Sequence, residues 1–420
     1  MLCPGEYDAR SRVVLQHVAR RIGMPSDRLR GLERLIAQRL YFARAAAMES
    51  AEDEETGVSD ASGEDDSGHL RNKRGRLRRW ATTGTSVVVG ALALGLTGGL
   101  AAPMLIVGMG ALGATWAATL ATAGGLALVT SLFGVAGGGL TGHRMARRTG
   151  GLAEFAFVPI GVDPHLPIIP SLHATIVVPG YLHPKMSADT PWYTAYNNHL
   201  KDHDVYALAF DTAVLHELDE AFRKFVAVEA ADYLIDQLLS QTVLNAVLAP
   251  LSAPMTLMKL GSIIDNPWGM AMNRARKAGH ALADILQDRV QGRRPISLIG
   301  YSVGALVIFK CLQELAKRRC YGLVDSGKSA LVLLGAPVRV DSQRWSDVRS
   351  VVSGRLVNGY IKSDWVLAFL YRVHERKLKP AGLQPISTPG VESVDLSDIV
   401  QGHLCYRKQL DAILHAINIS

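Results

Sequence analysis

From about residue 170 onward, short runs of β-branched and aliphatic residues alternate with longer segments that have helical periodicity. Continuous apolar runs separated by helices predict a mostly parallel sheet with helices on both of its faces. The runs expected to form strands are 174–178, 205–210, 296–299, 330–334, 355–357 and 393–396. The segments expected to form helices between them are 273–289, 305–319, 365–372 and 404–417. The pattern therefore predicts one α/β domain over residues 165–420.

Residues 212–270 interrupt this alternation with a long helical pattern that is strongly apolar from Leu238 to Leu260. An insertion of this length inside a compact domain calls for a role of its own. It could be a lid over an apolar pocket, a further element that touches a membrane, or a set of ordinary core helices. We favour an inserted helical cap that lies close to a membrane.

Residues 1–50 form the N-terminal helical segment, in which apolar residues from Leu29 to Leu40 recur at helical spacing and Ser26 or Asp27 can cap the helix. We expect a small helical pair that packs on the rest of the protein. Residues 51–69 are acidic and rich in Ser and Gly, so they bury too little apolar surface to become ordered. Together with the basic run that follows, residues 51–79 are expected to form a disordered linker.

Residues 80–142 contain no charged side chain and no histidine, and Gly, Ala, Leu and Val dominate them. The stretch is long enough for two membrane spans of about 20 residues each. Basic residues flank both ends, at 71–79 and 144–148, which places both ends in the cytosol and requires an even number of crossings. We therefore expect a transmembrane helical hairpin in a multi-pass protein whose N-terminus and α/β domain face the cytosol. The alternatives are a soluble Gly- and Ala-rich helical layer and a hairpin that enters one leaflet only.

The net charge of +7 and the pI of about 9.2 would suit either nucleic acid or anionic lipid as a partner. The compact basic run directly before the most apolar stretch favours a membrane surface, and no nucleic-acid partner is expected. The four cysteines, at positions 3, 311, 320 and 405, have neither paired nor metal-ligand spacing. Reduced thiols that face the cytosol are therefore expected. Residues 1–24 lack the apolar core of a cleaved signal peptide.

The segment 300–304, Gly-Tyr-Ser-Val-Gly, matches the G-x-S-x-G pattern of a nucleophile elbow. A strand pattern precedes it and a helix pattern follows it, so Ser302 is expected in a sharp strand-to-helix turn. Gly300 and Gly304 leave no Cβ atom where such a turn crosses neighbouring backbone. The hydroxyl of Ser302 would then stand exposed above the C-terminal edge of the sheet. An ordinary βα turn is the alternative interpretation.

A nucleophilic serine needs a base, and the base needs an acid that orients it. In the α/β-hydrolase fold the acid and the base follow the serine in chain order, each beyond the end of a later strand. Asp364 and His403 lie in those two places, so we expect them to form a catalytic triad with Ser302. Asp364 could instead serve only as the N-cap of the helix that follows. The rival acids are Asp395 and Asp398, and the rival base is His374.

An oxyanion hole needs two backbone N–H groups that point at the developing negative charge. We expect one from Val303, directly after the nucleophile, and the other from Tyr181 or Leu182, after the first predicted strand. The Gly-Ala-Pro turn at 335–337 is expected to line the edge of the sheet beside the site. No dinucleotide-binding or phosphate-binding glycine motif and no zinc-ligand spacing is present. We therefore expect no cofactor and no metal ion.

Several separate blocks of this sequence, in this order, carry a resemblance to a known family. The blocks are 298–309, 333–338, 357–366, 381–386, 394–398 and 402–404. Together they resemble the transmembrane and coiled-coil domain-containing protein 4 family (domain of unknown function 726), over roughly residues 75–417. The resemblance implies an α/β-hydrolase domain behind a membrane-embedded hairpin, and it supports Ser302, Asp364 and His403. It adds little about the substrate, and some fungal relatives look like accessory proteins of membrane trafficking.

These observations predict a membrane-anchored serine hydrolase of the esterase or lipase type, which acts on a lipid or another apolar ester at the bilayer. The alternative is a non-catalytic membrane trafficking adaptor built on an α/β-hydrolase scaffold. The presence of the serine, the acid and the histidine favours the enzyme, and the acidic linker is the best support for the adaptor. A peptidase is a weaker third hypothesis, because no motif marks a peptide-binding pocket. The sequence does not indicate any protein partner.

Overall fold

The computed structural model describes residues 7–56, 151–162, 171–239, 245–289, 294–325, 330–375 and 380–419. The predicted transmembrane hairpin at 80–142 and all but the start of the predicted linker lie outside these ranges. Among the helices within the described ranges, none is both long enough and apolar enough to cross a bilayer.

Seven strands form one sheet in the order β1-β3-β2-β4-β5-β6-β7. Only β1 runs antiparallel to its neighbour β3, and every other neighbouring pair is parallel. The strands are β1 (Phe155–Ile160), β2 (Ala174–Val178), β3 (Asp204–Phe210), β4 (Ile296–Tyr301), β5 (Leu331–Leu334), β6 (Leu356–Tyr360) and β7 (Val391–Asp395). The predicted mixed α/β architecture, with a mostly parallel sheet flanked by helices, is confirmed.

The sheet begins earlier in the chain than the expected boundary at residue 165. Strand β1 was not predicted, although it pairs with β3 along its whole length, from Phe155 opposite Phe210 to Ile160 opposite Val205. Pro159 near its end argues against a central strand, because proline cannot donate a ladder hydrogen bond. At the edge of the sheet this donor is not needed, so the strand is tolerated there.

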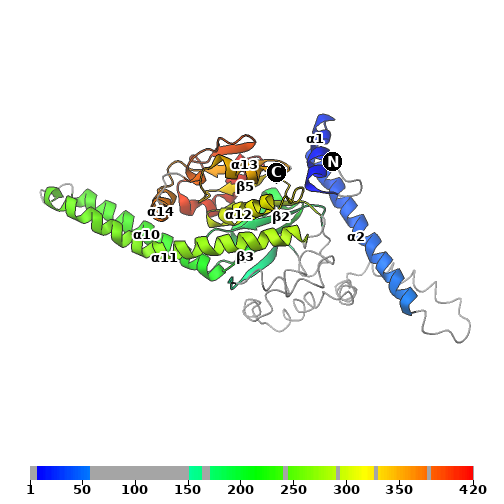
Figure 1. Cartoon of the computed structure of the whole chain (residues 1–420), viewed down its shortest axis with the longest axis horizontal. Coiled ribbons are helices and arrows are strands. Elements are labelled where there is room, and N and C mark those ends of the chain that lie inside the picture. The colour runs from blue at the N-terminus through cyan, green and yellow to red at the C-terminus, as the bar shows by residue number, and fades with distance from the viewer. Residues whose placement is uncertain are drawn as a thin grey trace, which may run out of the picture.

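Helices surround the sheet, and Figure 1 shows their arrangement. Helix α12 packs on β4 and on the neighbouring strands β2 and β5, and α11 packs against α12. The longer helices of the domain, these two included, are α10 (Thr212–Leu239), α11 (Asn245–Gln287), α12 (Val303–Lys317), α13 (Ser342–Ser350), α14 (Trp365–Glu375) and α15 (Leu410–Ala416). Shorter helical segments are η2 (Thr190–Trp192), α9 (Tyr193–Ala195), η3 (Tyr196–Leu200), η4 (Ala381–Leu383) and η5 (His403–Lys408).

The helical insertion is longer than predicted. It consists of α10 and α11, which pack on each other as a hairpin that projects from the body of the protein (Figure 1). The expected separate helix at 273–289 is the last part of α11, so the insertion runs to residue 287 and not to 270. The ends of the two helices near the sheet are buried, with Phe222, Phe225 and Trp268 at most 1% exposed. These ends belong to the core of the domain, which explains why α11 continues without a break from the insertion into the segment expected as a separate helix.

The N-terminal segment contains the expected pair of helices, α1 (Ala9–Arg21) and α2 (Ser26–Thr56). Helix α2 extends over the first six residues of the predicted linker, because the Ala and Glu residues there are good helix formers despite their charge. The buried Arg12 joins the pair to the domain. Its guanidinium lies 2.8 Å from Glu33 on α2 and 2.7 Å from the fully buried Asp325, which follows α12.

The parallel strands end together along one edge of the sheet. Val178 of β2 is opposite Gly300 of β4, and Tyr301 of β4 is opposite Leu334 of β5. Because the C-terminal ends of parallel strands meet at the same edge, the residues that follow these strands are neighbours in space. This edge carries the candidate site.

Candidate active site

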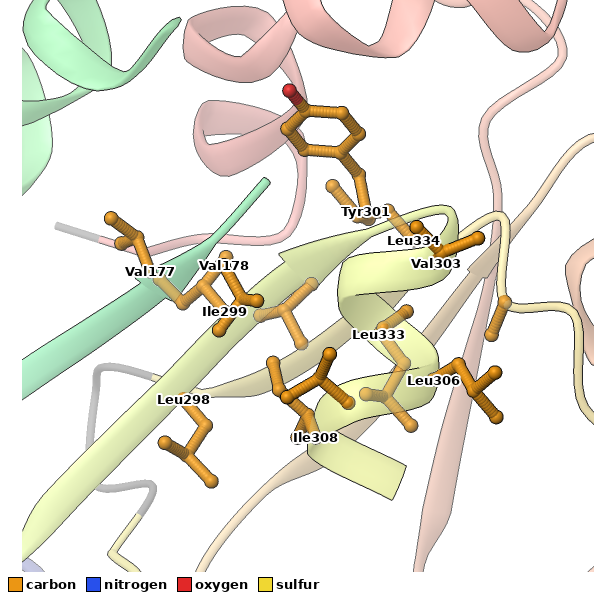
Figure 2. Close-up of a cluster of buried hydrophobic side chains, with 14 of the residues drawn as sticks. Val177, Val178, Leu298, Ile299, Tyr301, Val303, Leu306, Ile308, Leu333 and Leu334 are labelled. Carbon is orange, nitrogen blue, oxygen red and sulfur yellow. The ribbon is translucent and has the colours of Figure 1, made fainter. Parts of the chain in front are cut away.

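Ser302 is the single residue between β4 and α12. In Figure 2 the strand that carries Leu298 and Ile299 turns directly into the helix that carries Leu306. Ser302 has φ 54° and ψ −126°, a conformation that non-glycine residues rarely adopt and that costs about 1–3 kcal/mol. Its N–H donates to the carbonyl oxygen of Leu334 at 2.9 Å, which ties the turn to the neighbouring strand. The predicted sharp turn is therefore present.

Two glycines allow the backbone to close around this turn. A Cβ atom on Gly304 would lie 2.3 Å from the carbonyl oxygen of Val178, so a larger residue there would push β2 and α12 apart. A Cβ atom on Gly180 would lie 2.0 Å from the carbonyl oxygen of Tyr301. Gly300 is less constrained, because its nearest neighbour is the mobile end of the Ile308 side chain at 2.8 Å. The close approach predicted at Gly304 is therefore present, whereas the one at Gly180 is not indicated by the G-x-S-x-G pattern.

Ser302, His403 and Asp364 form a continuous chain of hydrogen bonds. The Oγ atom of Ser302 lies 2.7 Å from Nε2 of His403, and Nδ1 of His403 lies 2.7 Å from Oδ2 of Asp364. The three residues come from the ends of β4, β6 and β7, where the edge of the sheet brings them together. When Nδ1–H donates to Asp364, Nε2 is left free to accept the proton of the serine hydroxyl.

Asp364 has a role in both of the interpretations that the sequence left open. One carboxylate oxygen, Oδ2, faces His403, and the other, Oδ1, accepts a hydrogen bond from the N–H of Leu367 at 3.0 Å. The second bond caps the N-terminus of α14, which fixes the carboxylate in place. One side chain therefore serves both as a helix cap and as the partner of the histidine.

The rival acid Asp395 lies at the surface, where its two oxygens bind Lys362 and Ser397. The hydrogen bond from Lys362 is the main reason that the pKa of Asp395 is lowered. The structure therefore places this carboxylate in a surface ion pair and not beside His403. The side chain of His374 lies outside the described residues.

The expected oxyanion donors lie beside Ser302, but one of them is occupied. Val303 is the first residue of α12, and the N–H groups of the first helical turn have no acceptor within the helix. The N–H of Leu182 instead donates to the carbonyl oxygen of Leu215 on α10, at 3.2 Å. Leu182 is therefore not available as a donor in this conformation, which leaves Val303 and Tyr181 as the candidate donors.

The site is closed to solvent. Ser302 is 0% exposed, and Asp364 and His403 are each 1% exposed. This differs from the expected exposure of the serine hydroxyl, because sequence patterns do not show what packs over a strand end. The ring of Phe222, on α10, lies 5.3 Å from the imidazole of His403. We call residues 212–227 of α10 the cover segment.

Aromatic rings line the site around His403. The rings of Tyr181 and Tyr406 lie 5.8 Å and 5.9 Å from the imidazole. The hydroxyl of Tyr181 donates to the carbonyl oxygen of His403 at 2.6 Å, and the guanidinium of Arg407 lies 5.7 Å from the Tyr181 ring centre. Burial raises the pKa of Tyr181 and of Tyr406 well above its usual value, so both phenols stay neutral and can donate hydrogen bonds. The described surroundings of the histidine are therefore mainly aromatic, and the charges near it are Asp364 and the Arg407–Asp219 ion pair.

The fold and this site define a mixed α/β protein with a buried Ser-His-Asp cluster at the C-terminal edge of its sheet. The chain belongs to the family described as "Protein of unknown function (DUF726)", whose model matches residues 75–420. The family resemblance inferred from the sequence blocks is therefore confirmed.

Three curated relatives come from distant eukaryotes, and each alignment covers 99% of this chain. The transmembrane and coiled-coil domain-containing protein STS1 of Oryza sativa is 35% identical over 61% of its own length. The uncharacterized membrane protein F35D11.3 of Caenorhabditis elegans is 34% identical over 64% of its length. The probable lipase MIL1 of Saccharomyces cerevisiae is 33% identical over 37% of its length. This chain thus spans less than two thirds of each of these relatives, and no solved structure matches it significantly.

Proposed function

We propose that this protein is a serine hydrolase that cleaves a carboxylic ester with Ser302, His403 and Asp364. The observation that carries the proposal is the pair of 2.7 Å contacts that join the hydroxyl, the imidazole and the carboxylate in that order. The same order of groups supports acyl transfer on several unrelated folds. The strained turn at Ser302, between a parallel strand and a helix, supports an α/β-hydrolase fold.

The geometry supports a two-stage reaction. Oγ of Ser302 attacks the ester carbonyl while Nε2 of His403 takes the hydroxyl proton, and Asp364 stabilises the resulting imidazolium. The N–H groups of Val303 and Tyr181 stabilise the oxyanion of the tetrahedral intermediate. His403 then protonates the departing alcohol, which leaves an acyl group on Ser302. A water molecule, deprotonated by His403, releases the carboxylic acid and restores the serine.

A lipid ester is the substrate class that the surroundings favour. The wall around His403 is aromatic, and the buried site must open before any substrate reaches Ser302. A membrane setting is supported by the uncharged stretch at 80–142 and by the relatives that are named membrane proteins or a probable lipase. On this proposal the hairpin anchors a multi-pass protein, and its N-terminus and hydrolase domain face the cytosol.

A fluorophosphonate probe tests the proposal, because it reacts with an activated serine and with few other groups. The protein in lipid vesicles should be labelled, and Ser302→Ala should abolish the labelling. Ser363→Ala is a matched control, since it changes an exposed serine next to Asp364 and should leave labelling intact. A folded protein that is not labelled in lipid would instead support a non-catalytic trafficking adaptor. A panel of esters with increasing acyl length then defines the substrate.

A further inference from the structure

The N-terminal helix pair exposes an unusual number of large apolar side chains. Of the fifteen large hydrophobic residues that are exposed within the described chain, nine lie between positions 14 and 42. They are Val14, Leu15, Val18, Ile22, Leu32, Leu35, Ile36, Leu40 and Phe42. Soluble proteins rarely leave a dense apolar surface of this kind uncovered, and where they do it marks a binding site.

On each helix the exposed apolar residues follow helical spacing. On α1 and at its C-cap, Val14, Val18 and Ile22 lie four residues apart, and Val18 is 50% and Ile22 67% exposed. On α2, Leu32, Ile36 and Leu40 have the same spacing, and Leu40 is 58% exposed. Residues four apart share one face of a helix, so each helix presents an apolar stripe to its surroundings.

The opposite faces of both helices are already in use. Arg12 and Gln16 of α1 and Glu33 and Ala37 of α2 are buried where the pair packs together and against the domain. The double ion pair of Arg12 holds the two helices on Asp325. The exposed stripes therefore belong to helices whose inner faces are fixed, and turning the helices inward would break these contacts.

Several arginines beside the stripes have no carboxylate partner among the described residues. Within the described part of the chain, no ion pair is formed by Arg20, Arg21, Arg28 or Arg39. Along α2, Arg39 lies between the apolar residues Ile36 and Leu40. Before Glu49, α2 carries five arginines but only two acidic residues, Asp27 and the buried Glu33. An amphipathic helix with arginines beside its apolar face has the composition that binds in the interface of an anionic bilayer.

A second copy of the chain fits this surface less well. In a twofold dimer each patch would meet its own copy, so two surfaces of the same positive charge would face each other. Like charges at a buried contact oppose association. Anionic headgroups instead neutralise the arginines while the acyl boundary covers the apolar side chains.

We propose that the α1–α2 pair is a membrane-surface element, which lays its apolar stripes into the headgroup region of an anionic bilayer. This inference rests on the membrane location in the proposed function and does not depend on hydrolysis. Helix α2 would thereby hold the α/β domain, to which Arg12 fixes it, close to the bilayer surface.

Site-specific fluorescence on the full-length chain in vesicles tests the proposal. Cys3 and Cys320 are replaced by serine, and an environment-sensitive dye is attached at Val18→Cys or Ile36→Cys on the stripes. Gln38→Cys, exposed on another face of α2, is the control position, and the parent without an added cysteine supplies the background. Vesicles of phosphatidylcholine alone are compared with vesicles that also contain phosphatidylserine, and a lipid-borne spin label serves as the quencher.

We expect quenching at positions 18 and 36 to exceed that at position 38 several-fold in the phosphatidylserine vesicles. Replacing Arg20 and Arg21 by glutamine should weaken the association by about fivefold for each charge, which corresponds to about 1 kcal/mol per basic residue. Equal quenching at all three positions, or dye-to-dye contact between two copies without lipid quenching, would overturn the proposal. Probe labelling of Ser302 in the same samples reports on the hydrolase separately, so either proposal can fail alone.

Discussion

Arg407 and Asp219 form a buried ion pair, with Nη1 of the arginine 3.0 Å from Oδ1 of the aspartate, although 188 residues separate them in the chain. Asp219 lies on the cover segment, and Arg407 follows His403 on η5. The pair therefore links the segment that closes the site to the segment that carries the proposed base. The bond from Leu182 to Leu215 is a second such link, on the side of the proposed oxyanion donors.

Asp219→Asn should loosen this closure. The change leaves the guanidinium of Arg407 buried without its counter-charge, so we expect a loss of about 3–5 kcal/mol in the free energy of unfolding. Below the melting temperature, the fluorophosphonate probe should label Ser302 faster than in the parent. Arg223→Gln is the control, because Arg223 bonds to the same carboxylate from an exposed position and should contribute less than about 1 kcal/mol. Reduced stability with an unchanged labelling rate would show that the cover segment does not limit access.

Asp364→Asn should separate the two roles of this residue. Asparagine can still cap α14, so the stability should change little. It cannot hold His403 in the tautomer that accepts the serine proton, so kcat for ester hydrolysis should fall by about 10⁴-fold. Asp364→Ala should show the same catalytic defect and an additional loss of about 1 kcal/mol from the missing cap. Equal stability of the two variants would mean that the cap contributes nothing.

Gly180→Ala should disable the site by displacing backbone. The new methyl group would lie about 2 Å from the carbonyl oxygen of Tyr301 and close to Val303 N, so the elbow or the end of β2 must move. We expect loss of probe labelling together with a lower melting temperature. Gly402→Ala is the matched control, because a Cβ atom there meets nothing within 4 Å although the residue precedes His403. If Gly180→Ala labels normally, the tight packing of the elbow is not required.

Arg12→Met should detach the N-terminal helices from the domain. Asp325 would remain buried without its partner, which costs about 3–5 kcal/mol. Arg10→Gln breaks only an exposed ion pair with Asp8 and should cost less than about 1 kcal/mol. Urea unfolding midpoints of the two variants provide the comparison, and similar midpoints would rule out an anchoring role for Arg12.

Two histidines near the N-terminal ends of β2 and β3 should make the stability of the fold depend on pH. Nε2 of His203 lies 2.7 Å from Oγ1 of Thr175, and its ring lies 4.7 Å from that of His173. Burial, and then the nearby Arg12, lowers the pKa of His203 to about 3, and burial also lowers the pKa of His173. The other arginines that oppose the charging of His203 are Arg30, Arg34 and Arg294.

Because the folded pKa is depressed, the unfolded chain takes up the proton first as the pH falls below about 6.5. Stability is then lost progressively toward the folded pKa, by at most about 1.4 kcal/mol per pH unit for each histidine. The melting temperature should decrease between about pH 6.5 and pH 5, before most carboxylates titrate. His203→Gln can retain a bond to Thr175 and should make this decrease shallower. An unchanged slope in this variant would assign the effect to other groups.

Much of the site could be anticipated from the sequence because its parts follow local rules. A glycine-flanked serine between a strand and a helix has one compact conformation, and residues after parallel strands share one edge. The sequence indicates a cap or a lid at residues 212–270, but it does not show how Phe222 and Asp219 of this distant helix pack over that edge. Likewise, the contact of Gly180 with Tyr301 depends on the spacing of two strands, which local sequence does not encode. Strand β1 was not predicted because Pro159 argues against a strand, and the sequence does not show that this strand lies at the edge of the sheet.

The hydroxyl of Ser302 precedes its imidazole partner by 101 residues. A ribosome therefore completes the nucleophile long before it supplies the proton acceptor. On the proposed mechanism, a nascent chain that lacks His403, or a chain truncated before Gly402, cannot hydrolyse an ester even if its sheet has begun to form.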